Sequence, residues 1–141
     1  MTGYPRRFEG TLWLVGAALV LSGMALLPGA FELRWDRELA WRLPPGAGSD
    51  AATIHGVAAS LFAVQLGTLW VVHMRSGWRR RRHRASGLGS ALLLGALVAT
   101  GWGLYYAGER VGAWASAVHI VVGLVVPLAV LIHVLVGKRG R

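Results

Sequence analysis

Four long apolar runs, without Asp, Glu, Lys or Arg in their interiors, place the strongest constraint on what this chain can form. A helix needs about 20 apolar residues to cross the hydrocarbon layer of a membrane, and only helices and closed barrels satisfy their backbone hydrogen bonds there. The sequence therefore predicts an all-α integral membrane protein, a four-helix bundle running up, down, up and down. Within a single membrane domain, residues 1–141, we predict spans at about 11–28, 52–75, 87–108 and 112–137.

Composition agrees with a membrane protein and narrows the chemistry. Hydrophobic residues make up 55% of the chain and charged residues 15%, against about a quarter charged in ordinary soluble proteins. The chain has no cysteine, which excludes disulfides, thiolate metal sites, iron–sulfur clusters and c-type haem attachment. The first run is short, follows Arg6 and Arg7, and ends near small residues, so a cleaved signal peptide is an alternative for it.

Positive charges are unevenly distributed about the four runs. If the helices alternate in direction, eleven of the fifteen cationic residues fall on one side: Arg6, Arg7, Arg75, Arg79, Arg80, Arg81, Arg82, Arg84, Lys138, Arg139 and Arg141. Five of the six acidic residues fall on the other side. This positive-inside pattern predicts that both termini are cytoplasmic and that the protein is a multi-pass protein of a bacterial-type inner (cytoplasmic) membrane. Topology and contact with membrane lipid account for the arginine cluster, so we expect no nucleic-acid partner.

The loop between the first two runs has a periodic pattern of its own. Phe31, Trp35, Leu39 and Leu43 recur every four residues, with charged residues between them. This spacing predicts a short amphipathic helix at the outer interface, over about 31–43, that ends before two prolines.

Histidines are the main candidate metal ligands. His55 and His73 lie eighteen residues apart in the second run, and His119 and His133 lie fourteen apart in the fourth. At 3.6 residues per turn, each pair leaves one face of its helix. Alternating topology makes these two helices parallel, so His55 and His119 share the outer level while His73 and His133 share the inner level. For one membrane histidine alone, a hydrogen bond to a neighbouring helix or a water-lined cavity is an equally good interpretation.

Paired histidines without other ligands favour haem over zinc. Zinc requires three or four protein ligands, whereas haem iron needs only two axial ligands, and its apolar ring suits a bundle interior. We therefore expect two haem b groups, an outer one on His55 and His119 and an inner one on His73 and His133. Propionate contacts are possible from Arg75 and Arg79 on the inner side and from Arg110 on the outer side.

A weak internal repeat accompanies the histidines. LVLSGMALL in the first run resembles LVATGWGLYY in the third, which aligns Ser22–Gly23 with Thr100–Gly101. Each is followed by a helix with two histidines, so the repeat indicates a duplicated helical hairpin. Glycines such as Gly16 and Gly23 fit either close helix packing or a notch for a bulky group.

The two histidine-bearing segments also resemble a known family. HGVAASLFAVQLGTLWVVHMRSGW and HIVVGLVVPLAVLIHVLVGKR are similar to the second and fourth helices of the four-helix haem domain of cytochrome b in quinol-oxidising complexes, and to small bacterial cytochrome b561-like membrane proteins. His119 and His133, with Pro127 between them, match the family spacing, whereas His55 and His73 are one turn further apart. The resemblance implies two haems b and transmembrane electron transfer, often with a quinone.

The sequence thus predicts a di-haem b-type cytochrome that carries electrons between a quinone or cytoplasmic-side donor and an outer-face redox partner. We expect an electron-transfer subunit with partner subunits rather than a stand-alone enzyme. Two alternatives stay open. One is a non-redox membrane protein, such as a small transporter or assembly factor whose histidines relay protons or bind a metal, and the other is a quinone-coupled oxidoreductase acting alone.

Overall fold

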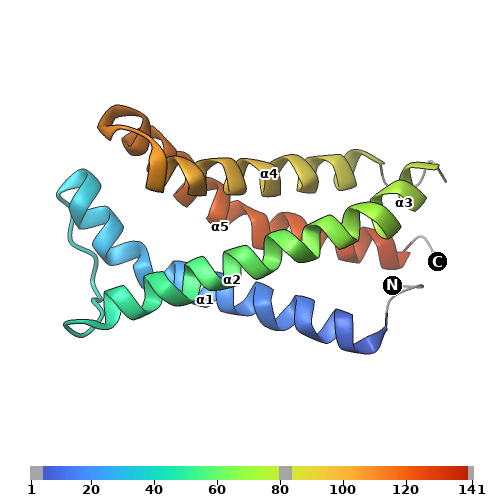
Figure 1. Ribbon diagram of the computed structural model, residues 1–141, viewed down its shortest axis with the longest axis horizontal. Coiled ribbons are helices and arrows are strands. Elements are labelled where there is room, and N and C mark those ends of the chain that lie inside the picture. Colours follow the sequence, from blue (N-terminus) through green and yellow to red (C-terminus); the bar gives the residue numbers. More distant parts are fainter. Residues whose placement is uncertain (1–4, 80–83, 140–141) are drawn as a thin grey trace. The chain divides into compact units, whose positions relative to one another are not determined.

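The regular secondary structure of the described residues is entirely helical. The computed structural model describes residues 5–79 and 84–139, with all of their side chains except those of Val72, His73, Lys138 and Arg139. Four helices in this part of the chain are long and apolar enough to cross a membrane, as Figure 1 shows: α1 (Arg6–Trp35), α2 (Ala47–Leu69), α4 (Arg84–Tyr106) and α5 (Glu109–Arg139). The prediction of an all-α chain with four membrane-length helices is confirmed.

The chain divides into two units near the end of α2. The first unit is Met1–Thr68, with α1 and α2, and the second is Leu69–Arg141, with α4 and α5. Each unit is described by itself below. The first contains His55 and the second contains His119 and His133.

Helix α1 extends beyond its apolar run at both ends. It starts after Pro5, whose carbonyl accepts the first backbone N–H groups, and Glu9 adds a favourable negative charge in the first turn. It ends where Asp36 takes a left-handed conformation, with φ of 50°. The Asp36 N–H donates to the Glu32 carbonyl, the bond of a left-handed (αL) cap, and the Arg37 N–H donates to the Phe31 carbonyl.

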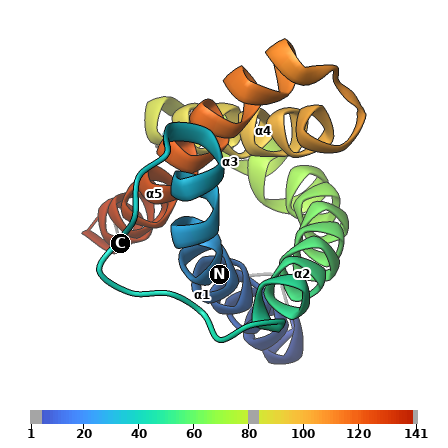
Figure 2. The same cartoon turned by 90° about the vertical axis from the view of Figure 1, so that its left-hand side faces the viewer.

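This cap overturns the predicted amphipathic helix over about 31–43. Phe31 to Trp35 form the last turn of α1, and residues 37–46 are irregular up to the start of α2, as the teal segment in Figure 2 shows. A left-handed residue cannot continue a right-handed helix, so the four-residue periodicity is interrupted at Asp36. Arg42 links the loop to α1 through the carboxylate of Glu32, at 3.2 Å, and also pairs within the loop with Glu38, at 2.8 Å.

The predicted span over 52–75 is not one uniform α-helix. After Leu69 the chain forms one π-helical turn, η1 (Trp70–Met74), in which the Arg75 N–H donates to the Trp70 carbonyl, and it continues as α3 (Arg75–Arg79). A π turn accommodates an extra residue within a helix and is frequent at functional sites. His73 is therefore in a π-helical backbone, and the extra spacing between it and His55 includes this turn.

The beginning of α4 is linked to α3 by one arginine. The Arg84 guanidinium donates to the Trp78 carbonyl at 2.7 Å from Nη2 and 3.1 Å from Nε, and it lies 4.8 Å from the centre of the Trp78 ring. The predicted loop arginines Arg80, Arg81 and Arg82 fall outside the described residues.

Helices α4 and α5 form a closely packed antiparallel hairpin (Figure 1). Only Ala107 and Gly108 separate them. The packing is tightest near this turn, where a Cβ built on Gly103 would lie 3.0 Å from the Ala115 Cβ. Helix α5 continues through Pro127 without a break, as membrane helices with neighbouring partners can.

Candidate functional site

His55 on α2 contacts a serine of α1. Its Nδ1 lies 3.0 Å from Oγ of Ser22, a buried residue. The Ser22 hydroxyl also lies 2.6 Å from the carbonyl oxygen of Ala18, one turn earlier in α1. A hydroxyl has a single hydrogen, and the carbonyl can only accept it. We therefore assign the Ser22 O–H to Ala18 and the second hydrogen bond to His55, whose Nδ1–H donates to Oγ.

His119 on α5 repeats this arrangement with a threonine of α4. Its Nδ1 lies 2.9 Å from Oγ1 of Thr100, which donates to the carbonyl of Ala96 at 2.7 Å. By the same reasoning the His119 Nδ1–H donates to Thr100. Ser22 and Thr100 are the aligned positions of the internal repeat, so the repeat marks two equivalent histidine contacts.

His133, further along α5, has a third contact of this kind. Its Nδ1 lies 3.1 Å from Oγ of Ser86, in the first turn of α4. Ser86 was not predicted from the sequence. Its signal is the spacing: Ser86 precedes Thr100 by fourteen residues, and His133 follows His119 by fourteen. In antiparallel helices, equal steps in opposite directions keep two residues at one level, about 21 Å from the first pair.

A glycine follows each of the three hydroxyl residues and faces the same imidazole. A Cβ built on Gly23 would lie 3.2 Å from Cε1 of His55. The corresponding distances are 3.6 Å from Gly101 to His119 and 3.8 Å from Gly87 to His133. The first is tighter than an ordinary van der Waals contact, whereas the other two are ordinary. Gly16, the other glycine considered for a notch, has nothing within 4 Å of such a Cβ.

The assigned hydrogen bonds determine which ring nitrogen can coordinate a metal. In a neutral imidazole only one nitrogen carries hydrogen, and the other carries a lone pair. When Nδ1–H donates to a hydroxyl, Nε2 carries the lone pair. Metal-ligating histidines are usually held in this way by a hydrogen bond from the second ring nitrogen. His55 and His119 thus have the tautomer that an axial ligand requires.

Clusters of potential metal ligands can be searched for only among the described side chains. Among the described side chains, no three His, Cys, Asp or Glu residues group as a metal site would need. A group that needs only two axial ligands does not require such a cluster.

The remaining predicted site residues are His73, Arg75, Arg79 and Arg110. The side chain of His73 lies outside the described side chains. Arg75, Arg79 and Arg110, the predicted propionate contacts, are exposed. Gln65, at mid-depth in α2, has a buried Oε1 without a hydrogen-bond partner among the described residues.

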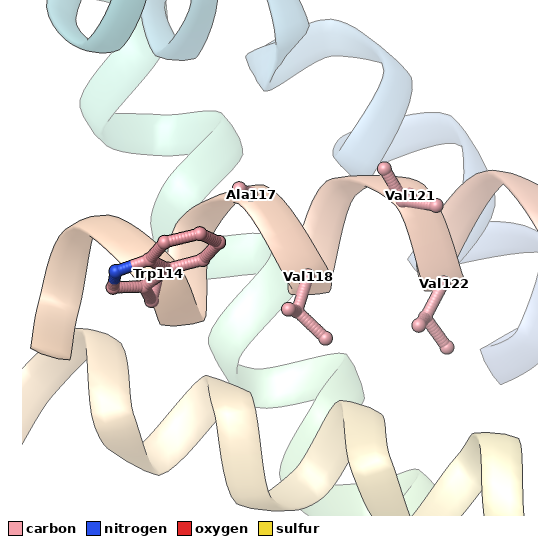
Figure 3. A pocket seen from close by; sticks show the side chains of 5 residues that line it. All are labelled: Trp114, Ala117, Val118, Val121 and Val122. Atoms are coloured by element: carbon pink, nitrogen blue, oxygen red, sulfur yellow. The ribbon is translucent and has the colours of Figure 1, made fainter.

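An apolar hollow lies on one face of α5. It has a volume of about 230 Å³ and is lined by Trp114, Ala117, Val118, Val121 and Val122, which Figure 3 shows along this helix. Its lining side chains are apolar apart from the Trp114 indole N–H, and it is below the usual size of small-molecule sites, about 300–1,000 Å³.

Comparison with known proteins finds no match for this chain among protein-family models, curated proteins or solved structures.

Proposed function

We propose that this chain is a di-haem b-type membrane cytochrome that carries electrons across the membrane. The observation that supports it best is the held imidazole: His55 and His119 each donate Nδ1–H to a hydroxyl of the neighbouring helix, so that each offers Nε2 to a metal. Four spans with few polar groups, and two histidine-bearing helices among them, suit a large apolar ligand better than a hydrated ion.

In this proposal His55 and His119 hold an outer haem b, and His73 and His133 hold an inner one. Haem supplies one-electron chemistry when bound. The protein provides axial ligation, an apolar surrounding and a fixed orientation for each imidazole. Electrons pass between a quinone or cytoplasmic-side donor and an outer-face partner, with the chain as a subunit of a larger complex in a bacterial-type inner membrane and both termini cytoplasmic.

A proton-relay role for the histidines fits the hydrogen bonds less well. A relay needs a chain of groups that can each pass a proton onward. The Ser22 and Thr100 hydroxyls instead donate to backbone carbonyls of their own helices, where a proton path would end. These two hydrogen bonds therefore favour fixed metal ligands over a proton relay.

A redox difference spectrum of the purified full-length chain in detergent tests the proposal. We expect b-type bands on reduction with dithionite, and their loss or halving in His55→Ala and His119→Ala. His83→Ala is the matched control, because this histidine of the arginine-rich segment is not a predicted ligand. Absent bands, or bands of full height in both ligand variants, would contradict the proposal.

A further inference from the structure

The hydroxyl–glycine pair occurs three times, each time against a different histidine: Ser22–Gly23, Ser86–Gly87 and Thr100–Gly101. Helix packing alone requires small residues at these places, but it does not require a hydroxyl. Alanine would fill a serine position without placing a polar oxygen in an apolar span, where an unpaired polar group is costly. The recurring hydroxyl therefore calls for a role directed at the histidine.

We infer that Ser22, Thr100 and Ser86 are positioning residues that set the coordinating strength of His55, His119 and His133; this inference rests on the proposed haem function. A hydroxyl that accepts Nδ1–H fixes the orientation of the ring. It also draws the proton away from the ring and so makes Nε2 a stronger electron donor. A stronger donor stabilises ferric iron relative to ferrous iron, which lowers the reduction potential.

The three residues act on two different haems. Ser22 holds His55 and Thr100 holds His119, and these histidines are the proposed ligands of one haem. Ser86 holds His133, a proposed ligand of the other. Removing the Ser22 and Thr100 hydroxyls should therefore shift the reduction potential of one haem through both of its ligands. Removing the Ser86 hydroxyl should shift the potential of the other haem through one ligand.

Serine and threonine are interchangeable in this role, because the two equivalent positions of the repeat use one of each. Ser22→Thr and Thr100→Ser retain the hydroxyl, whereas Ser22→Ala and Thr100→Val remove it. Ser60→Ala and Thr53→Val are matched controls on α2. Their hydroxyls donate to Gly56 at 3.0 Å and to Ser49 at 2.9 Å, one turn earlier in the same helix.

The test is a redox titration of the purified full-length variants, followed by absorbance with chemical mediators. Each reduction adds one electron to one ferric haem. In Ser22→Ala or Thr100→Val we expect the ferrous-to-ferric ratio of one haem to rise about tenfold at a fixed potential, similar in size to the smallest effects on metal affinity when a hydrogen-bond partner of a metal ligand is removed. This corresponds to a shift of about 59 mV to more positive potential. The double variant shifts the same haem further, and Ser86→Ala shifts the other.

The outcomes separate this inference from the proposed function. If the wild-type chain binds no haem, both the inference and the proposed function are wrong. Two haems in the wild type, with potentials in Ser22→Ala and Thr100→Val equal to those of the Ser60→Ala and Thr53→Val controls, overturn the inference alone. If Ser22→Ala loses haem, then a normal potential in Ser22→Thr supports the inference, and loss of haem in that variant too contradicts it.

Discussion

The two long helical hairpins of this chain hold histidines in the same way but pack differently. In the α4–α5 hairpin the helices are in close contact, a two-residue turn joins them, and two hydroxyl–histidine contacts lie fourteen residues apart on each helix. In the α1–α2 hairpin the connection is a loop from residue 36 to residue 46, and one such contact, Ser22 to His55, is described.

This difference shows which features belong to the repeated histidine contact and which belong to the packing of each hairpin. Both hairpins have the hydroxyl, the glycine and the imidazole at the outer position, although their turns and packing differ. The local contact is therefore independent of how tightly its two helices pack elsewhere. At the predicted inner position the two differ: α5 remains α-helical through His133, whereas His73 lies in the π turn η1 that follows α2.

The largest expected effect on stability is in the tight hairpin. Gly103→Ala would place a Cβ 3.0 Å from the Ala115 Cβ, and neither side chain can rotate away. Overpacking of this kind typically costs about 1–3 kcal/mol. We expect a lower melting temperature in detergent, followed by circular dichroism. Gly95→Ala, on the same helix with nothing within 4 Å, is the control and should not lower it.

A smaller effect should distinguish the glycines that face histidines. Gly23→Ala would place a Cβ 3.2 Å from Cε1 of His55, against 3.6 Å for Gly101→Ala at His119. The His55 ring must shift by a few tenths of an ångström, which offsets the gain of about 1 kcal/mol that alanine brings in a helix. Melting temperatures should therefore rise less in Gly23→Ala than in Gly101→Ala.

Gly29 is exposed on α1, and a Cβ built on it has nothing within 4 Å. The Gly29→Ala variant should therefore show the gain from helix propensity alone. If Gly23→Ala stabilises the chain as much as Gly29→Ala does, the close contact at His55 has no energetic consequence.

The smallest effect should come from the loop of the α1–α2 hairpin. Arg42 pairs with Glu32 and Glu38, but its side chain is 49% exposed. Exposed ion pairs contribute about 0.2–1 kcal/mol and weaken with salt. Arg42→Ala should therefore lower stability by a few tenths of a kcal/mol, near the lower end of this range, and the difference should disappear in high salt. A larger, salt-independent loss in thermal unfolding would show that the loop is an integral part of the fold.

Much of the fold follows from the sequence, because uncharged apolar runs of membrane length leave few alternatives. The repeat of Ser22–Gly23 in Thr100–Gly101 also identified two positions that contact histidines. The loop helix was predicted wrongly because periodicity carries no information about a left-handed cap at Asp36. The π turn was not predictable either, since a uniformly apolar segment shows no break when one turn takes an extra residue. Ser86 was missed because a single serine in an apolar helix has no pattern until its partner is known.

Haem stoichiometry of the purified chain tests the central claim most directly. We predict two haems b per chain in the wild type and one in His55→Ala, in His119→Ala and in the double variant of these two, since both histidines hold the same haem. We predict none in His119→Ala combined with His133→Ala. No haem in the wild type would contradict the di-haem proposal, and so would a double variant His55→Ala with His119→Ala that loses both haems while each single variant loses one.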